Sequence, residues 1–329
     1  MARKVILDTN LWSYIGDEGS VHDLRSILAQ HECAVMLPPS MLIELLRNPH
    51  ADSRNKHISA ICGIRGRRLA SEAQLCAEDF VRVVKRRRHE WLRSVADMAT
   101  VAKFNYRWTK EWWSWAASDP DGTHSLVMSG YDPSAEIVTV QRDNRANRLR
   151  DKFIVDYCDV RVSSEPKEAT RAMGGWDGTK TEAWRVDVGS SYWFNMSTSR
   201  GRPGYSGPVQ TNRDWIGSYI DMRSAIADPV SFATLFLEEL TPEEVPRDWM
   251  RAAVAYTQTA TKIGLGNPRD EQHSAYLVDA DIFLSADKRL VDVLNEVRRQ
   301  APFSVAEPRV VEIHGAVRKV DAIATALTA

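Results

Sequence analysis

The chain has few cysteines and no long apolar run, and each of these features excludes a kind of protein. Its 329 residues include four cysteines, Cys33, Cys62, Cys76 and Cys158, with no pair at the close spacing of a zinc knuckle. This pattern excludes the disulfide framework of a small secreted protein and favours reduced thiols. No stretch approaches the ~18 consecutive apolar residues of a membrane span, and the N-terminus has no leader-like apolar region. We therefore expect a cytoplasmic protein with no membrane partner.

Several common phosphate-binding and metal-binding motifs are also missing. The residues that follow the first apolar run, DTNLW at 8–12, contain no Gly-x-Gly turn for a dinucleotide, and the chain has no P-loop. Asn10 stands where an aspartyl-phosphate enzyme would carry a second Asp, and the eight histidines are scattered rather than clustered. The formal net charge is −1, so any affinity for nucleic acid must come from local basic patches.

Short apolar runs lie at the two ends of the chain. Residues 3–8, 33–37 and 282–284 have the apolar, β-branched character of buried strands, and a last strand is predicted around 310–311. Helical patterns alternate with these runs, which predicts an α/β fold with a central parallel sheet. The middle of the chain has a mainly helical pattern, except for a Gly/Trp-rich stretch at 174–217 that we interpret as a loop. We therefore predict a discontinuous domain, 1–55 and 228–329, interrupted by a helical insertion, 56–227.

Four carboxylates fall where these strands end or where the next helices begin. Asp8 closes the first strand, Glu44 lies on the helix that follows the second, Asp270 opens a later helix, and Asp287 follows the strand at 282–284. The carboxyl ends of parallel strands meet at one edge of a sheet, so we expect these four side chains to converge. Converging carboxylates repel one another unless a cation lies between them, and Mg²⁺ or Mn²⁺ suits such oxygen ligands.

Each acid also has a simpler interpretation. Asp8, Asp270 and Asp287 could serve only as caps or first-turn charges of their helices. Glu44 could form a salt bridge with Arg47 or face solvent. His273, one turn after Asp270, is interpreted as a structural or exposed histidine. The common position of the four acids at strand–helix junctions, rather than any one of them, favours a shared site.

These segments resemble the PIN-domain nucleases. The family has an Asp at the end of its first strand, often in Asp-Thr-Asn, and VILDTN at 5–10 matches this motif. PSMLIELL at 39–46 places Glu44 where the family has a helical Glu, and NPRDEQH at 267–273 places Asp270 at the start of a later helix. The family's fourth acid follows a strand, usually as Thr-x-Asp; here SAD at 285–287 keeps the hydroxyl but replaces Thr with Ser. The resemblance covers 1–50 and about 265–295 of the chain.

The resemblance implies a three-layer α/β/α fold and metal-dependent cleavage of phosphodiester bonds, most often in RNA. Asp8, Glu44, Asp270 and Asp287 would then be the catalytic residues and the ligands of Mg²⁺ or Mn²⁺. Asn10 and Ser285 would hydrogen-bond to these ligands and orient them. The family also suggests a toxin or defence role, with a protein inhibitor (an antitoxin) and a homo-oligomer as candidate partners.

The basic run Lys85, Arg86, Arg87 and Arg88 is a candidate surface for the phosphate backbone of RNA. The same run is equally consistent with a solvated helix face. Two functional alternatives share the predicted fold: a structure-specific DNA nuclease, and a non-catalytic nucleic-acid-binding protein. The acids and the basic run do not distinguish ribose from deoxyribose.

Overall fold

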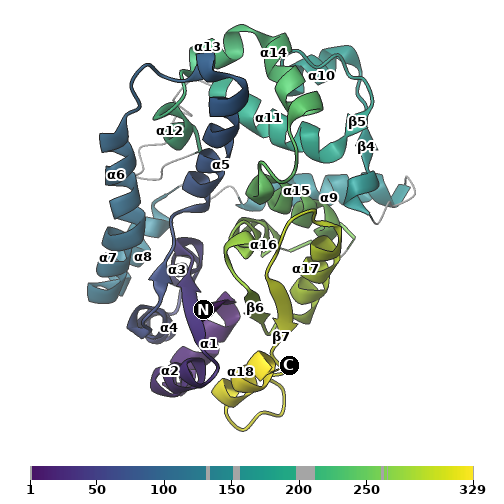
Figure 1. Cartoon of the computed structure of the whole chain (residues 1–329). Helices are drawn as coiled ribbons and strands as arrows, with labels where there is room; N and C mark the ends of the chain where they lie inside the picture. The colour runs from purple at the N-terminus through teal and green to yellow at the C-terminus, as the bar shows by residue number, and fades with distance from the viewer. Residues whose placement is uncertain are drawn as a thin grey trace.

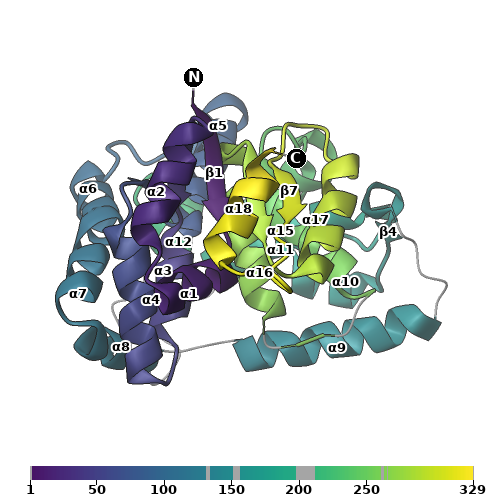
Figure 2. The same ribbon diagram turned by 90° about the horizontal axis from the view of Figure 1, so that it is seen from below.

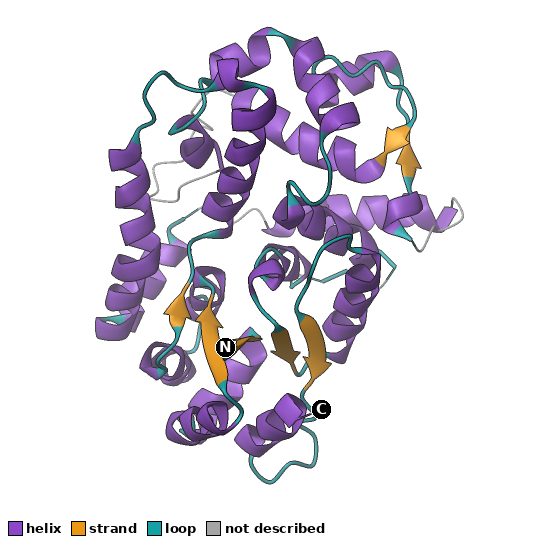
Figure 3. Cartoon of the chain, viewed as in Figure 1, coloured by secondary structure: helices purple, strands orange, loops and turns teal. Residues whose placement is uncertain are grey.

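A five-stranded parallel sheet joins the two ends of the chain. The computed structural model describes residues 2–130, 134–150, 156–197, 212–260, 263–264 and 266–328. The strands are β1 (Arg3–Leu7), β2 (Cys33–Leu37), β3 (Arg67–Arg68), β6 (Ile282–Ser285) and β7 (Glu307–Val310). They lie in the order β3-β2-β1-β6-β7, and every pairing is parallel (Figure 3). The predicted α/β class and the predicted parallel sheet are therefore confirmed.

The sheet is wound in two directions from β1. The chain passes from β1 to β2 and β3 through α1 (Thr9–Glu18), α2 (Val21–Gln30), α3 (Pro39–Leu46) and α4 (Ala51–Gly63). It passes from β6 to β7 through α17 (Lys288–Gln300), on the other side of β1. Right-handed crossovers in opposite directions place their helices on opposite faces of a sheet. This winding is compatible with three layers, helix, sheet and helix.

The remaining helices at the C-terminal end support the same sheet. They are α15 (Pro246–Gln258), α16 (Asn267–Ser274) and α18 (Lys319–Thr328). The helix α15 packs against α16 and α17, while α18 packs against α1 and α2 (Figure 1). The helix α18 has no counterpart among the sequence predictions, and its contact with α1 and α2 brings the two ends of the chain together.

The middle of the chain forms a second, mainly helical part. Its longer elements are α5 (Glu72–Arg87), α6 (Met98–Tyr106), α7 (Trp112–Ser118), α8 (Pro120–Met128), α9 (Ser134–Arg150), α10 (Pro166–Ala172), α11 (Ala183–Ser197), α12 (Asn212–Gly217), α13 (Met222–Ala227) and α14 (Pro229–Thr234). A two-stranded antiparallel ribbon joins β4 (Arg161–Val162) to β5 (Thr181–Glu182). Figure 2 shows α9 along one side of the molecule, where it packs against α16.

The prediction of a loop over 174–217 is wrong for much of that stretch. The helix α11 occupies Ala183–Ser197 and α12 occupies Asn212–Gly217, whereas 198–211 lie outside the described residues. A glycine inside α11 explains part of the misleading signal. A Cβ atom on Gly189 would lie 2.5 Å from Met173 Sδ and 3.0 Å from Phe236 Cβ. Gly189 is therefore required for close packing and does not break the helix.

The sheet extends into the range predicted as insertion. The short strand β3, at Arg67–Arg68, pairs with the end of β2, and α4 packs against α1. The buried apolar side chains of the described residues form one cluster, which runs from the sheet into the helical middle. None of the described helices combines the length and the apolar character that crossing a membrane requires.

Candidate active site

The pairing of β1 with β6 brings Asp8 and Ser285 together. Leu7 lies opposite Leu284, and the Asp8 amide donates to the Leu284 carbonyl at 2.8 Å. Asp8 caps α1, because its Oδ1 accepts from the Thr9 amide at 2.7 Å. Both residues leave the sheet at the same edge, as the parallel pairing of their strands requires. The cap function is therefore real, but it uses only one oxygen of the Asp8 carboxylate.

The second carboxylate oxygen of Asp8 is held by the two residues predicted to orient it. Ser285 Oγ donates to Asp8 Oδ2 at 2.5 Å, and Asn10 Nδ2 donates to the same oxygen at 2.7 Å. Ser285 Oγ itself accepts from the Asp287 amide at 2.9 Å, while Asn10 Oδ1 accepts from the Ala286 amide at 3.2 Å. These bonds fix the hydroxyl and the amide as donors toward Asp8.

Glu44 joins Asp8 through the first residue of α1. Thr9 Oγ1 donates to Glu44 Oε2 at 2.6 Å. Two basic residues on α16 also face Glu44: Arg269 Nη1 lies 3.5 Å from Oε1, and His273 Nε2 lies 3.6 Å from Oε2. Glu44 is therefore partly buried between α1 and α16. The simpler interpretation of Glu44 as a solvent-facing residue is wrong.

The pKa of Asp270 is affected by the charges of the other three acids. Its pKa is raised well above the ordinary value, first by burial and then by the negative charges of Asp8, Glu44 and Asp287. Charges act on one another in this way only over short distances, so the four carboxylates lie near one another. Gln258 Nε2 donates to Asp270 Oδ2 at 3.0 Å, and Arg289 partly offsets the repulsion.

The two strand-end acids differ in exposure. Asp8 is buried, and burial raises its pKa, while the Ser285 hydrogen bond and the charge of His273 act in the opposite direction. Asp287 is exposed and caps α17, with its Oδ1 accepting from the Leu290 amide at 3.1 Å. The site therefore has a buried side at Asp8, a partly exposed acid at Asp270, and an open side at Asp287.

Sequence reasoning missed the basic residues of the site. His273 is buried, with 4% of its surface exposed, and it lies beside Glu44. It is therefore not an exposed histidine, whereas its interpretation as a structural histidine stays a prediction. Arg269 and Arg289 supply two further positive charges. Their positions relative to the acids offered a signal: Arg269 precedes Asp270, His273 follows it by one helical turn, and Arg289 lies in the first turn after Asp287.

The donor set fits a hard divalent cation. Within the described parts of the chain, no three His, Cys, Asp or Glu side chains are already arranged to hold a metal ion. The four acids nevertheless offer only oxygen atoms, the donors preferred by Mg²⁺ and Mn²⁺. The pKa values of Asp8 and Asp270 are both raised, so a cation between them would offset a repulsion that the neighbouring side chains leave partly uncompensated.

Asp270→Asn should stabilise the metal-free protein. A raised pKa in the folded state means that folding disfavours the ionised carboxyl. This penalty is absent below the ordinary pKa of Asp and complete above the raised one, so it operates at pH 7. We expect a gain of about 1 kcal/mol in the free energy of unfolding at pH 7, the usual size for single stabilising substitutions. Urea unfolding in EDTA at pH 7 and pH 4 measures it, and the gain should shrink at pH 4.

Asp281→Asn is the matched control for that experiment. Asp281 lies at the opposite end of β6, where its Oδ2 accepts from the Lys4 amide at 2.6 Å. At this end of the strand, Asp281 lies away from Asp287 and from the carboxyl edge of the sheet. Asp281→Asn should leave the stability nearly unchanged at both pH values. A loss of stability in Asp270→Asn at pH 7 would contradict the repulsion that we infer.

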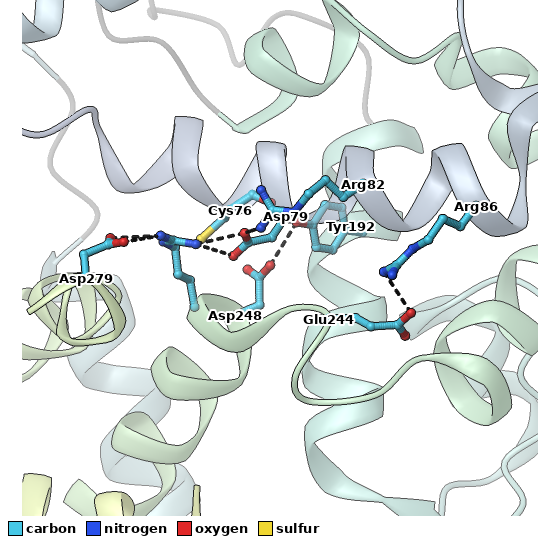
Figure 4. A network of polar contacts seen from close by, with 9 residues as sticks. Cys76, Asp79, Arg82, Arg86, Tyr192, Glu244, Asp248 and Asp279 are labelled. Carbon is cyan, nitrogen blue, oxygen red and sulfur yellow. Dashed lines mark hydrogen bonds and ion pairs between the residues drawn. The ribbon is translucent and has the colours of Figure 1, made fainter. Parts of the chain in front are cut away.

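Three arginines of the basic run have carboxylate partners within the protein. Arg86 and Arg87 contact Glu244, with Arg87 Nη2 lying 2.9 Å from Oε1 and 3.1 Å from Oε2. Arg88 Nη2 donates to Glu239 Oε1 at 2.7 Å. These pairs tie the end of α5 to the turn before α15 (Figure 4 shows Arg86 and Glu244). Arg87 and Arg88 therefore have a structural role, and phosphate binding by Lys85 and Arg86, which are exposed, stays a prediction.

A buried ion-pair network joins the helical middle to the sheet (Figure 4). Arg247 on α15 donates to both oxygens of Asp79 on α5 at 2.8 Å. Its other nitrogen donates to both oxygens of Asp279, in the segment before β6, at 2.8 and 2.9 Å. Tyr192 on α11 donates to Asp248 at 2.9 Å in the same region. This network fixes the segment that leads into β6.

Comparison with known proteins does not assign the chain to a family. No protein-family model, no curated protein and no solved structure matches it.

Proposed function

We propose that the protein is a metal-dependent endoribonuclease that hydrolyses the phosphodiester bonds of RNA. The observation that supports the proposal is the closeness of the four carboxylates: the charges of Asp8, Glu44 and Asp287 all raise the pKa of Asp270. Helix capping explains Asp8 and Asp287 one at a time but does not require the acids to gather. Clustered carboxylates at the carboxyl edge of a parallel sheet are typical of a divalent-cation site for phosphate chemistry.

The residues have distinct roles in this proposal. Asp8, Asp270 and Asp287 would hold Mg²⁺ or Mn²⁺ directly, and Glu44 would either hold it or orient water beside it. The chemistry supplied by the bound cation is activation of water and neutralisation of charge on the phosphodiester. Ser285 and Asn10 hold the Asp8 carboxylate in one orientation. Thr9 and Arg269 donate to Glu44 and hold it in the same manner, and His273 lies beside it.

The test compares labelled single-stranded RNA with single-stranded and branched DNA in Mn²⁺, Mg²⁺ or EDTA. We expect cleavage of RNA in Mn²⁺ or Mg²⁺ and none in EDTA. Cleavage of branched DNA alone would favour the structure-specific DNA nuclease. Binding of nucleic acid without cleavage under all three conditions would favour the non-catalytic alternative. The toxin role, a protein inhibitor and a homo-oligomer remain proposals that rest on the resemblance to PIN-domain nucleases.

Binding of the cation can be measured without activity. Because the acids repel one another, a divalent cation should bind the folded protein and raise its melting temperature, with a stabilisation that grows with the logarithm of the cation concentration above the dissociation constant. We expect Mn²⁺ to raise the melting temperature of the wild type and EDTA to reverse the change. Asp270→Asn should reduce the shift, whereas Asp281→Asn should keep it. An equal shift in all three proteins would place the cation elsewhere.

A further inference from the structure

The helical middle of the chain contains a basic cavity at the far end of α5. Its volume is about 640 Å³. Three arginines and one acid supply its charged lining, and apolar side chains supply its floor: Arg93, Arg213, Arg223, Asp221, Ile220 and Met222. The cavity lies after η1 (His89–Trp91) and beside α12 and α13, so it is separate from the four acids.

Two paired segments form a rigid frame for this cavity. Leu92 and Ile220 form an antiparallel bridge. On either side of it, the Arg93 amide donates to the Tyr219 carbonyl at 2.9 Å, and the Asp221 amide donates to the Trp91 carbonyl at 2.8 Å. Ile220 is buried, with 1% of its surface exposed. The backbone that carries Arg93 and Asp221 is therefore held in place before any ligand arrives.

The positive charge of the arginines is largely available. Arg213 Nη1 donates to the carbonyls of Asn195 and Met196 at 2.6 and 2.8 Å, and Arg93 Nη1 donates to the Gly217 carbonyl at 2.9 Å. Carbonyl groups orient a guanidinium without neutralising it, and each guanidinium carries five N–H donors. Among the described residues, none of the three arginines of this cavity forms an ion pair with a carboxylate.

The single acid of the lining has a local function. Asp221 accepts from the Arg223 amide at 3.0 Å and from Ser224 Oγ at 3.0 Å, and so caps α13. The Ser224 hydrogen bond lowers the pKa of Asp221, which is therefore ionised at neutral pH. Three arginines and one aspartate leave the lining with two positive charges in excess. A ligand with several negative charges and apolar surface matches this combination.

We propose that this cavity binds the phosphates of single-stranded RNA at a distance from the four acids. The proposal rests on the proposed ribonuclease function and adds a second point of contact for the substrate. Guanidinium groups bind phosphate oxygens through paired hydrogen bonds. The partly exposed side chains of Leu92 and Met222, which also line the cavity, offer apolar surface to unstacked bases.

The length of α5 sets the distance that an RNA must span to reach both the four acids and the cavity. The start of α5 lies beside α16, where Gln272 Nε2 donates to Glu72 Oε1 at 2.7 Å, and Asp270 is on the same helix α16. The end of α5 leads through η1 to Leu92 and Arg93, which line the cavity. A helix of 16 residues is ~24 Å long. An RNA of only two or three nucleotides cannot reach both places, so the cavity should favour longer substrates.

The test is binding of a single-stranded RNA of about 20 nucleotides to the full chain in EDTA, which prevents metal-dependent cleavage. The variant Arg93→Gln/Arg223→Gln should bind the RNA about tenfold more weakly at low salt. The slope of log affinity against log salt should flatten by about 1.4, because each phosphate contact on a single strand contributes roughly 0.7. Arg65→Gln/Arg171→Gln removes two exposed arginines outside the cavity and should behave as the wild type does.

Unchanged affinity and slope in Arg93→Gln/Arg223→Gln would overturn the proposal, as would a wild type that binds no RNA. Loss of binding to a poly-glutamate peptide with unchanged RNA binding would also overturn it, in favour of an acidic protein partner. A wild type that binds RNA in EDTA but cleaves none in Mn²⁺ would remove the proposed function alone. In that case, the salt slopes still decide whether the cavity holds the RNA.

Discussion

Asp8→Asn should abolish cleavage of RNA while the fold is retained. Asp8 is the acid at the centre of the site, since its two oxygens contact Thr9, Asn10 and Ser285. Loss of a residue that only orients a metal ligand typically costs roughly 10–100-fold in activity or metal affinity. Removal of the ligand charge itself should exceed the upper figure. Cleavage rates in Mn²⁺, measured at several metal concentrations, provide the comparison.

The isosteric change keeps the structural function of Asp8. Asn is as good a helix N-cap as Asp, and its side-chain oxygen can accept from the Thr9 amide. The circular dichroism spectrum should therefore match that of the wild type, although some stability should be lost, because the new NH₂ group replaces the oxygen that accepts from Ser285 and Asn10. Asp281→Asn, at the opposite end of β6, is the control that should retain activity. Full activity in Asp8→Asn would show that the reaction uses another site.

Ser285→Ala tests the orientation of the Asp8 carboxylate separately from its binding of the metal ion. The substitution removes the 2.5 Å hydrogen bond to Asp8 and the acceptor of the Asp287 amide but leaves all four carboxylates. We expect a loss of activity of about 10–100-fold, which should be smaller than the loss in Asp8→Asn. An unchanged rate would mean that Asn10 alone is sufficient to orient Asp8.

Arg247→Met should produce the largest loss of stability. Arg247 is the shared partner of Asp79, which has no exposed side-chain surface, and of Asp279. Burial alone would lower the pKa of Arg247, but the two carboxylates raise it, so the guanidinium stays charged. Removal of one member of a buried ion pair leaves an uncompensated charge and typically costs about 3–5 kcal/mol. Urea unfolding at pH 7 measures the loss.

Two further variants test the cause of that loss. Asp79→Asn in the Arg247→Met background removes the uncompensated charge and should restore part of the stability. Arg318→Met removes an exposed ion pair with Asp23 and should cost at most about 1 kcal/mol. If Arg247→Met also cost less than about 1 kcal/mol, the network in Figure 4 would not hold the helical middle against the sheet.

The positions of the acids at strand–helix junctions were predictable because their signals are local. An apolar, β-branched run that ends in Asp8 identifies a strand and its carboxyl end without knowledge of the partner strand. The same holds for Asp287 after β6 and for Glu44 on the helix after β2. Parallel pairing then brings these ends to one edge of the sheet. The sheet confirms that part of the argument, whereas the metal and the RNA stay predictions.

The partners of charged side chains were not predictable from their spacing. The run at Lys85–Arg88 has the composition of a nucleic-acid-binding helix, yet Arg87 and Arg88 form ion pairs with Glu244 and Glu239. Those acids lie about 150 residues further along the chain, so no local pattern connects them to the run. A charged residue has the same identity whether water, phosphate or a carboxylate faces it, and only the packing of α5 against the turn before α15 distinguishes these cases.

The sequence by itself determined the elements whose patterns are local: the strands β1, β2 and β6, the helices that follow them, and the acids at their junctions. Tertiary structure alone decided the place of β3, the helical state of α11, and the approach of His273 and Arg269 to Glu44. Hydrophobic periodicity acts over one or two turns of chain, whereas these features depend on contacts between distant segments. Gly189 shows the difference, because its role in α11 depends on Phe236, a residue of a different helix.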